Sequence, residues 1–163
     1  MRSWSARAAL FLGIVWSSPI TLPAFVLYVL PLWVLGLYTF RGWDEVAWVW
    51  TFDAGVGRSL LRRLLDARWR GWAGHACGNI IVMKTRDASH EGMTLRHEKA
   101  HVRQAMVMGP MFIIVYLAFY ATCRFLLRDA DGYYDNPMEI DARRAAGQVI
   151  DVVGVVNKLS RRV

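Results

Sequence analysis

The sequence has few charged residues and few cysteines. Charged side chains make up 20% of its 163 residues, whereas roughly a quarter is usual for soluble domains. The two cysteines, Cys77 and Cys123, are too few for a disulfide framework or a four-thiolate zinc site, and they form no Cys-x-x-Cys pair. The length allows one domain of ordinary core volume and argues against a multidomain enzyme. We therefore expect a single domain with free, buried thiols.

Hydrophobic residues are abundant, and the net charge is positive. Hydrophobic residues make up 55% of the chain and the formal net charge is +7, against roughly 45–50% apolar residues in soluble domains. A hydrophobic content this high excludes intrinsic disorder. Because nucleic-acid-binding proteins are normally rich in charge, the combination of apolar and basic character predicts a lipid membrane as partner rather than nucleic acid.

The apolar residues are concentrated near the N-terminus. No charged residue lies between Arg7 and Arg41, and this stretch exceeds the ~20 residues that a helix needs to cross a bilayer. Three prolines interrupt it and leave two arrangements open: one tilted helix over about 22–40, or a helical hairpin that turns at Ser17–Pro23. The hairpin would leave the flanking arginines in the cytoplasm, as the positive-inside tendency favours. Residues 1–41 are thus predicted to be a membrane anchor or hairpin, because the hydrophobicity continues beyond a cleaved signal peptide.

The segment 42–78 differs in composition from the run before it. Trp43, Trp48 and Trp50 follow the apolar run, and the amphipathic indole ring is typical of the headgroup layer. Over residues 58–70, four leucines fall on one helical face and four arginines largely elsewhere. A basic helix of this kind lies either in the membrane interface or on the surface of its own domain. We therefore expect an interfacial, tryptophan-rich and basic segment.

One motif carries chemistry: residues 97–101 read His-Glu-Lys-Ala-His. On a helix, side chains four positions apart lie one above the other, so His97 and His101 can reach one zinc ion. Glu98 is rotated by roughly 100° from His97 and can contact a metal-bound water instead of the metal. Thr94 is the expected N-cap of this helix. The spacing predicts a hydrolytic zinc site, and the alternative is a structural histidine pair.

A zinc site needs a third protein ligand, and the sequence further downstream offers one. Asn136 and Pro137 are typical of a helix start, which makes Glu139 the third helical residue. A glutamate in this position often caps its own helix, but the histidine pair upstream favours a ligand role. Asp135 and Asp141 are the alternatives.

Together these features resemble zinc metallopeptidases of the gluzincin type, in which a glutamate on a second helix completes the site. The resemblance covers residues 79–147 and is carried by the histidine motif, Gln104 and the run Asn136-Pro137-x-Glu139-x-Asp141-Ala142. It implies a zinc ion held by His97, His101 and Glu139. It also implies that Glu98 is the general base and acid.

The resemblance has further implications for the substrate and for supporting residues. It implies hydrolysis of a peptide or protein that pairs in extended form with a sheet edge, formed by the strand that we expect at Asn79–Lys84. A second oxyanion donor is usual, and a group beside the metal often orients a ligand histidine. The candidates for the oxyanion donor are Tyr133, Tyr134 and His75. The candidates for the group that orients a ligand histidine are Gln104, Asp141 and Asp135.

Gln104–Cys123 is a second uncharged stretch, long enough to be a transmembrane helix. If it crossed the bilayer, His101 and Glu139 would lie on opposite sides, because the polar link 128–132 cannot return through lipid. A zinc site therefore excludes a simple span. We expect a helix, bent at Gly109-Pro110, that is either buried against the active-site helix or dips into the membrane surface.

The sequence thus predicts a mainly α-helical protein with a small β element. An N-terminal hydrophobic anchor (1–41) and an interfacial segment (42–78) precede an α+β zincin-like metallopeptidase core (79–163). The expected function is that of a membrane-anchored zinc metallopeptidase whose core lies on the cytoplasmic side. The alternatives are a non-enzymatic membrane protein with a structural or degenerate zinc site, and a membrane-binding or partner-binding protein.

Overall fold

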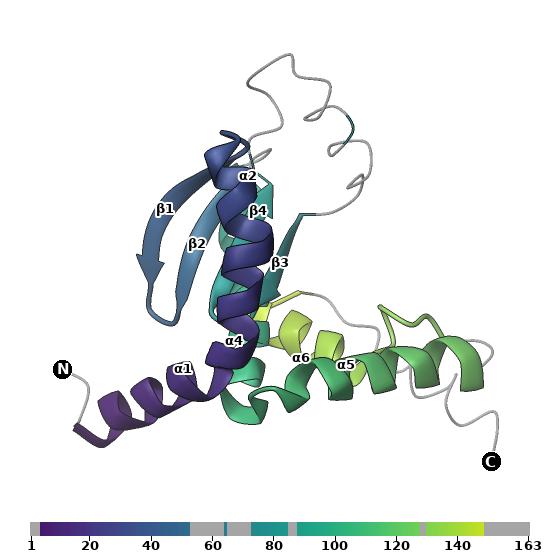
Figure 1. Ribbon diagram of the computed structural model, residues 1–163. Coiled ribbons are helices and arrows are strands. Elements are labelled where there is room, and N and C mark those ends of the chain that lie inside the picture. The colour runs from purple at the N-terminus through teal and green to yellow at the C-terminus, as the bar shows by residue number, and fades with distance from the viewer. Residues whose placement is uncertain (1–3, 53–63, 65–72, 85–87, 128–129, 149–163) are drawn as a thin grey trace.

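The computed structural model of the protein describes residues 4–52, 64, 73–84, 88–127 and 130–148. It is mainly helical with one small sheet, as the sequence predicts (Figure 1). The elements are, in chain order, α1 (Trp4–Ala24), the π-helical turn η1 (Phe25–Val29), α2 (Leu30–Val34), β1 (Tyr38–Asp44), β2 (Ala47–Phe52), β3 (Gly74–Cys77), β4 (Ile80–Lys84), α4 (Ala88–Met108), α5 (Met111–Ala121), the π-helical turn η2 (Thr122–Leu126) and α6 (Pro137–Ala146). The predicted basic helix over 58–70 lies outside the described residues except for Leu64.

The N-terminal elements α1, η1 and α2 form one helical run, Trp4–Val34, which is long and apolar enough to cross a membrane. The predicted hairpin is wrong, because Pro19 and Pro23 lie inside α1. A proline removes one backbone hydrogen bond but holds φ near its helical value, so packing against the sheet is able to keep the helix continuous. The predicted single helix over 22–40 is displaced as well, since β1 begins at Tyr38.

The four strands have the order β1-β2-β4-β3. β2 pairs with β4 in parallel, and the other two pairs are antiparallel. The predicted strand is present as Ile80–Lys84, but the expectation that it forms the sheet edge is wrong, because β4 is hydrogen-bonded on both sides. In the described sheet, β3 is the edge strand on this side. The sheet also contains residues from all three segments that the sequence predicts, 1–41, 42–78 and 79–163.

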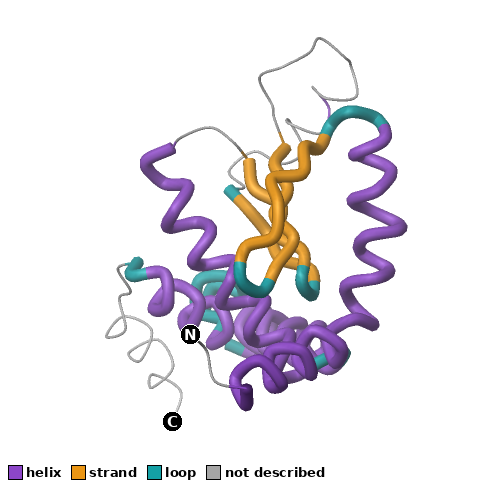
Figure 2. The backbone as a smooth tube through the Cα atoms, turned by 90° about the vertical axis from the view of Figure 1, so that its left-hand side faces the viewer, coloured by secondary structure: helices purple, strands orange, loops and turns teal. Residues whose placement is uncertain are grey.

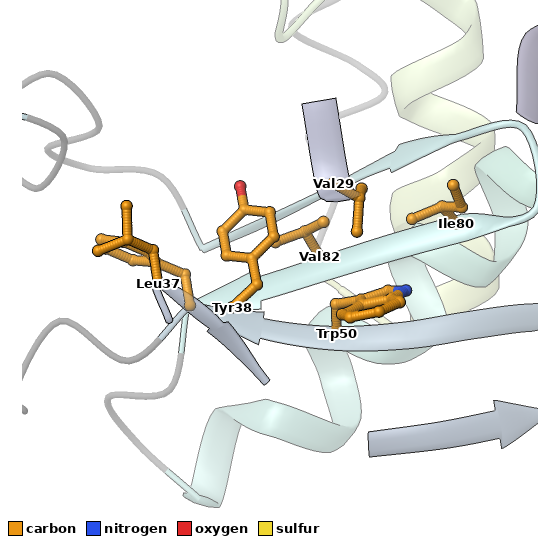
Figure 3. Close-up of a cluster of buried hydrophobic side chains, with 7 residues drawn as sticks. Val29, Leu37, Tyr38, Trp50, Ile80 and Val82 are labelled. Atoms are coloured by element: carbon orange, nitrogen blue, oxygen red, sulfur yellow. The ribbon is translucent and has the colours of Figure 1, made fainter. Parts of the chain in front are cut away.

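The sheet lies between the N-terminal helical run and α4 (Figure 2). On the face toward the helical run, Val29 packs among side chains of β1, β2 and β4 (Figure 3). On the opposite face, Val102 of α4 packs against Ile81. Trp50 is 5% exposed, so its predicted place in the headgroup layer is wrong: it lies in an interior strand and points toward the helical run. Trp43 is half exposed.

Both cysteines are free, as expected. Cys123 is buried, whereas Cys77 in β3 is only half-buried. Burial raises the pKa of both thiols, which disfavours the reactive thiolate. A redox or nucleophilic role for either cysteine is therefore not indicated.

A buried asparagine ties the N-terminal helix to the sheet. The side-chain oxygen of Asn79 accepts hydrogen bonds from the hydroxyl groups of Ser17 and Thr21. Its amide nitrogen donates to the carbonyl of Val46 at 2.9 Å, and its backbone N–H donates to Thr21 Oγ1 at 3.0 Å. Because a buried polar group is costly without partners, this network holds α1 in one position on the core.

We expect the substitution Asn79→Ala to lower the free energy of unfolding by about 2–4 kcal/mol, because it leaves several buried polar groups without partners. Chemical denaturation of the purified protein in detergent measures this change. Replacement of the exposed Arg144 of α6 by alanine, outside this network, is the control. A loss of less than about 0.5 kcal/mol, typical of an ordinary surface position, would show that the network does not hold the helix in place.

α5 follows α4 after a bend of 117° at Gly109-Pro110, as predicted. Gly109 has φ +56°, and a Cβ there would lie 2.4 Å from the Trp16 indole of α1, so only glycine fits this corner. Within α5, which the structure describes in full, Phe112 is the only buried side chain. The predicted burial of this helix is therefore wrong for most of its length, although Phe112 does pack against Ala105 of α4. An apolar helix cannot cover all of its sides in so small a domain.

Candidate metal centre

The helix α4 presents the histidine motif to the protein interior. His97, Glu98 and His101 are 6%, 5% and 6% exposed. α4 begins at Ala88, so the prediction of Thr94 as its N-cap is wrong. The helix begins further toward the N-terminus than the apolar periodicity indicates. The histidine motif therefore lies in the middle of α4, with helical turns before and after it.

The second helix, α6, begins as predicted. The side chain of Asn136 accepts a hydrogen bond from the backbone N–H of Met138 at 3.0 Å, and Pro137 occupies the first turn. Glu139 is 2% exposed. Its carboxylate faces the two histidines rather than the start of its own helix.

Three side chains converge at one point between α4 and α6. The Nε2 atoms of His97 and His101 lie 3.2 Å apart, and each is 3.2 Å from one carboxylate oxygen of Glu139. Their ligand atoms all lie within 4.8 Å of one another. In a tetrahedral zinc site with bonds of ~2.0–2.1 Å, donor atoms are separated by about 3.3–3.4 Å. The spacing therefore fits a zinc ion.

The two alternative carboxylates for the third ligand, Asp135 and Asp141, make hydrogen bonds to other groups. Asp135 is buried, and its Oδ2 accepts a hydrogen bond from the backbone N–H of Asp131 at 2.7 Å. Asp141 Oδ2 accepts one from Gln104 Nε2 at 2.9 Å. Neither belongs to the cluster of potential metal ligands that the described residues form.

Gln104 determines which nitrogen of His101 faces the cluster. Its amide nitrogen donates to the carbonyl of Met138 at 3.1 Å and to Asp141. Its oxygen lies 2.9 Å from His101 Nδ1. Nδ1 must therefore carry the proton and donate it, so that Nε2 presents a lone pair toward Glu139. Asp141 and Gln104 thus form a hydrogen-bonded chain that ends at His101.

The cluster is composed of hydrogen-bond acceptors, which suits a cation. Glu139 Oε1 accepts a hydrogen bond from the Tyr116 hydroxyl at 2.8 Å. Among the described residues, no group donates a hydrogen bond to Glu139 Oε2, which lies 3.2 Å from His97 Nε2. Buried acceptors that face one another are costly unless a positive charge lies between them. A metal ion would satisfy them together.

The electrostatics of the cluster reflect burial and close charges. Burial alone would raise the pKa of Glu139, but the nearby rings of His101 and His97 and the hydroxyl group of Tyr116 hold it well below its ordinary value. Burial alone would lower the pKa of His101, but the neighbouring carboxylate of Glu139 raises it. Burial raises the pKa of Glu98 to about 7, although both histidines oppose the shift.

A cavity of about 920 Å³ opens beside the cluster. His97, Glu98, His101 and Glu139 form part of its wall, and β3, α5 and residues 133–134 contribute other parts. β3 passes close to Glu98: a Cβ on Gly74 would lie 3.2 Å from the carboxylate oxygen. The missing side chain thus lets the edge strand lie directly against the candidate general base.

The three candidates for an oxyanion donor all line this cavity. Burial raises the pKa of the Tyr133 phenol, and the nearby Glu139 raises it further. Tyr134 is 62% exposed, and burial lowers the pKa of His75 to about 4, which keeps that ring neutral at pH 7. Of the three candidates for the oxyanion donor, Tyr133 is therefore the one whose hydroxyl group interacts with Glu139 of the cluster.

Tyr116 is a site residue that sequence reasoning missed. It lies in the uncharged run of α5, where the neighbouring apolar residues gave no indication of a polar contact. Its hydroxyl group nevertheless reaches Glu139 across the cavity. The signal available was a tyrosine in an otherwise apolar helix, since a buried hydroxyl group needs a partner; α5 has two, Tyr116 and Tyr120.

The resemblance to gluzincins rests on the motif residues alone, because the chain matches no protein-family model, no curated protein and no solved structure.

Proposed function

We propose that the protein is a membrane-anchored zinc metallopeptidase that hydrolyses peptide bonds. The observation that carries this proposal is the convergence of His97, His101 and Glu139, with Glu98 beside them on the wall of an open cavity. When bound there, zinc supplies a Lewis acid that activates water and polarises a carbonyl group. A purely structural zinc site has four protein ligands and no open position, so the open cavity favours catalysis.

The residues around the metal have separate roles in this proposal. Glu98 takes the proton of the attacking water and passes it to the leaving amine. Gln104 keeps His101 in the tautomer that presents Nε2, and Tyr116 positions Glu139. Tyr133 donates a hydrogen bond to the developing oxyanion of the substrate.

The substrate binds in extended form beside β3. β3 is an edge strand of the described sheet, and residues 73–76 line the cavity. An edge strand offers backbone N–H and C=O groups to which another extended chain adds by hydrogen bonding. Because Gly74 has no side chain, β3 lies close to Glu98, and a peptide paired with β3 is brought near this carboxylate.

The apolar helical run Trp4–Val34 supports attachment to a membrane. Its outward face carries exposed large apolar side chains, among them Phe11, Val15 and Leu27. We place the catalytic core on the cytoplasmic side, because six arginines occur from residue 41 to residue 70, whereas only Arg2 and Arg7 lie before or at the N-terminal end of the run. Resistance of the protein to extraction by alkaline carbonate, and protection of its core from external protease in cells, test these two points.

Metal analysis of the purified full-length protein tests the proposed function. We expect about one zinc per chain, hydrolysis of a casein or mixed-peptide substrate, loss of that activity with a chelator, and recovery when zinc is added back. Protein that is purified without zinc and does not take it up would reject the proposal. Zinc at this stoichiometry with no hydrolysis, and unfolding on chelation, would show a structural site instead.

A further inference from the structure

Two side chains of α5 belong both to the wall of the cavity and to the outer surface of the protein. Ile113 and Leu117 line the cavity, and they are 46% and 56% exposed. They are four residues apart and therefore lie on one face of the helix. Ile113 and Leu117 thus connect the wall of the cavity with the outer surface of α5.

The outside of α5 has the properties of a lipid-facing surface. No charged residue occurs between Arg103 and Arg124, and α5 and η2 expose a series of apolar or aromatic side chains. They are Met111, Ile113, Ile114, Leu117, Phe119, Tyr120, Phe125 and Leu126. Exposed apolar patches of this extent mark sites of interaction with proteins or membranes.

Basic and aromatic residues at the ends of the exposed helices favour a bilayer over a protein partner. The Arg124 guanidinium lies 5.7 Å from the centre of the Phe125 ring, and Arg7 lies 5.8 Å from that of Trp4. Pairs of this kind are typical of the headgroup layer, where the ring is partly in lipid and the cation contacts phosphate. The N-terminal part of α1 and α5 also lie at the same end of the molecule, below the sheet (Figures 1 and 2).

Apart from a bound zinc ion, the cavity wall offers little that would hold an acidic side chain of a substrate. Glu98 and Glu139 contribute carboxylates to its wall. Arg143 is the only arginine or lysine among the described residues that line it, and its guanidinium group donates to the carbonyls of Tyr133 and Tyr134. No free cation is therefore present in that lining to receive an acidic side chain, while Ile113 and Leu117 offer an apolar contact.

We propose that this site takes apolar segments of membrane-bound proteins, which reach it from the bilayer along α5. The bilayer covers the outer face of α5, and the extended substrate lies between β3 and that helix. Substrate side chains that point away from β3 then contact Ile113 and Leu117. This inference rests on the proposed peptidase function and names its substrate class.

The test uses the zinc-loaded full-length protein in vesicles of phosphatidylcholine and phosphatidylglycerol. Two fluorogenic peptides of equal length serve as probes: a myristoylated peptide with leucine and alanine around the cleaved bond, and an unlipidated peptide with serine and glutamate there. We expect kcat/KM to be at least about tenfold higher for the first peptide, the effect of one or two apolar contacts. Equal values, or a preference for the second peptide, would overturn the inference.

Two variants of α5 separate the cavity wall from general attachment to lipid. Leu117→Gln removes an apolar contact inside the cavity, whereas Ile114→Gln removes one of similar exposure, 59%, outside the cavity lining. Both are expected to bind vesicles equally well. Only Leu117→Gln should reduce the preference for the apolar peptide, by about tenfold. An equal reduction in both variants would contradict a role for the cavity wall.

A second measurement distinguishes failure of this inference from failure of the peptidase proposal. Benzoylphenylalanine in place of Leu117 is expected to form lipid adducts on illumination in vesicles, and the same group in place of Glu45 is not. Adducts at position 117 without hydrolysis of either peptide would reject the peptidase and with it the substrate class, while the lipid-facing wall would stand. Hydrolysis of both peptides without adducts would reject the route through lipid and leave the peptidase intact.

Discussion

Replacement of Glu98 by glutamine is expected to lower kcat/KM for peptide hydrolysis by a factor of about 10²–10⁴, the usual contribution of a general base. Glutamine has nearly the same shape but cannot accept the proton of the attacking water. Because Glu98 is 5% exposed and burial raises its pKa to about 7, a neutral isostere fits its surroundings without loss of stability. Kinetics with a fluorogenic peptide, together with zinc content and a thermal unfolding curve, measure these effects.

The matched control for this variant is Glu45→Gln. Glu45 is an acidic residue outside the cavity lining and forms ion pairs with Lys99 and Arg103 on the outer side of α4. Loss of such a surface interaction changes stability by less than about 1 kcal/mol, and kcat/KM should remain within about twofold. Undiminished turnover by zinc-loaded Glu98→Gln would reject the assignment of Glu98 as general base.

Replacement of Glu139 by alanine is expected to weaken zinc binding by more than about 100-fold, since even residues that only orient a metal ligand contribute 10–100-fold. The substitution removes the one carboxylate that faces His97 and His101. It should also abolish the stabilisation by zinc, which amounts to about 2.7 kcal/mol when free zinc is 100 times its Kd. Calorimetric titration with zinc and unfolding curves with and without zinc measure both quantities.

Asp141→Asn provides a graded comparison for the ligand assignment. Asp141 contacts Gln104, which in turn contacts His101, so we expect it to weaken zinc binding by about tenfold. Asp135→Asn should change stability rather than zinc binding, because Asp135 bonds to the backbone of its own loop. Loss of zinc in Asp141→Asn but not in Glu139→Ala would show that the third ligand is Asp141.

The parts of the site that could be predicted from sequence are those that depend on neighbours a few residues away. The spacing of His97 and His101 is a property of one helix, whose periodicity places both rings on the same face. Asn136 and Pro137 define a helix start because capping is a local hydrogen bond. The exclusion of a simple membrane span by Gln104–Cys123 likewise followed from chain connectivity.

Other features depend on residues far apart in the chain, and for these the sequence was insufficient. Trp50 and Trp43 lie in the same pair of strands, yet Trp50 is buried and Trp43 half exposed, because packing of the helical run on the sheet decides which face is covered. The sheet edge is β3 rather than β4 because strand order depends on long-range pairing.

The sequence by itself determined the chemistry available to this protein: two histidines and a glutamate at helical spacing, a second helix that carries a carboxylate, and an apolar N-terminal run. Only the tertiary structure decided where that chemistry operates. It brought Glu139 to the histidines and Tyr116 to Glu139, and it left α5 exposed beside the cavity. The reason is physical: ligand spacing within one helix is set by backbone geometry, whereas the meeting of α4, α5 and α6 is set by packing of the whole core.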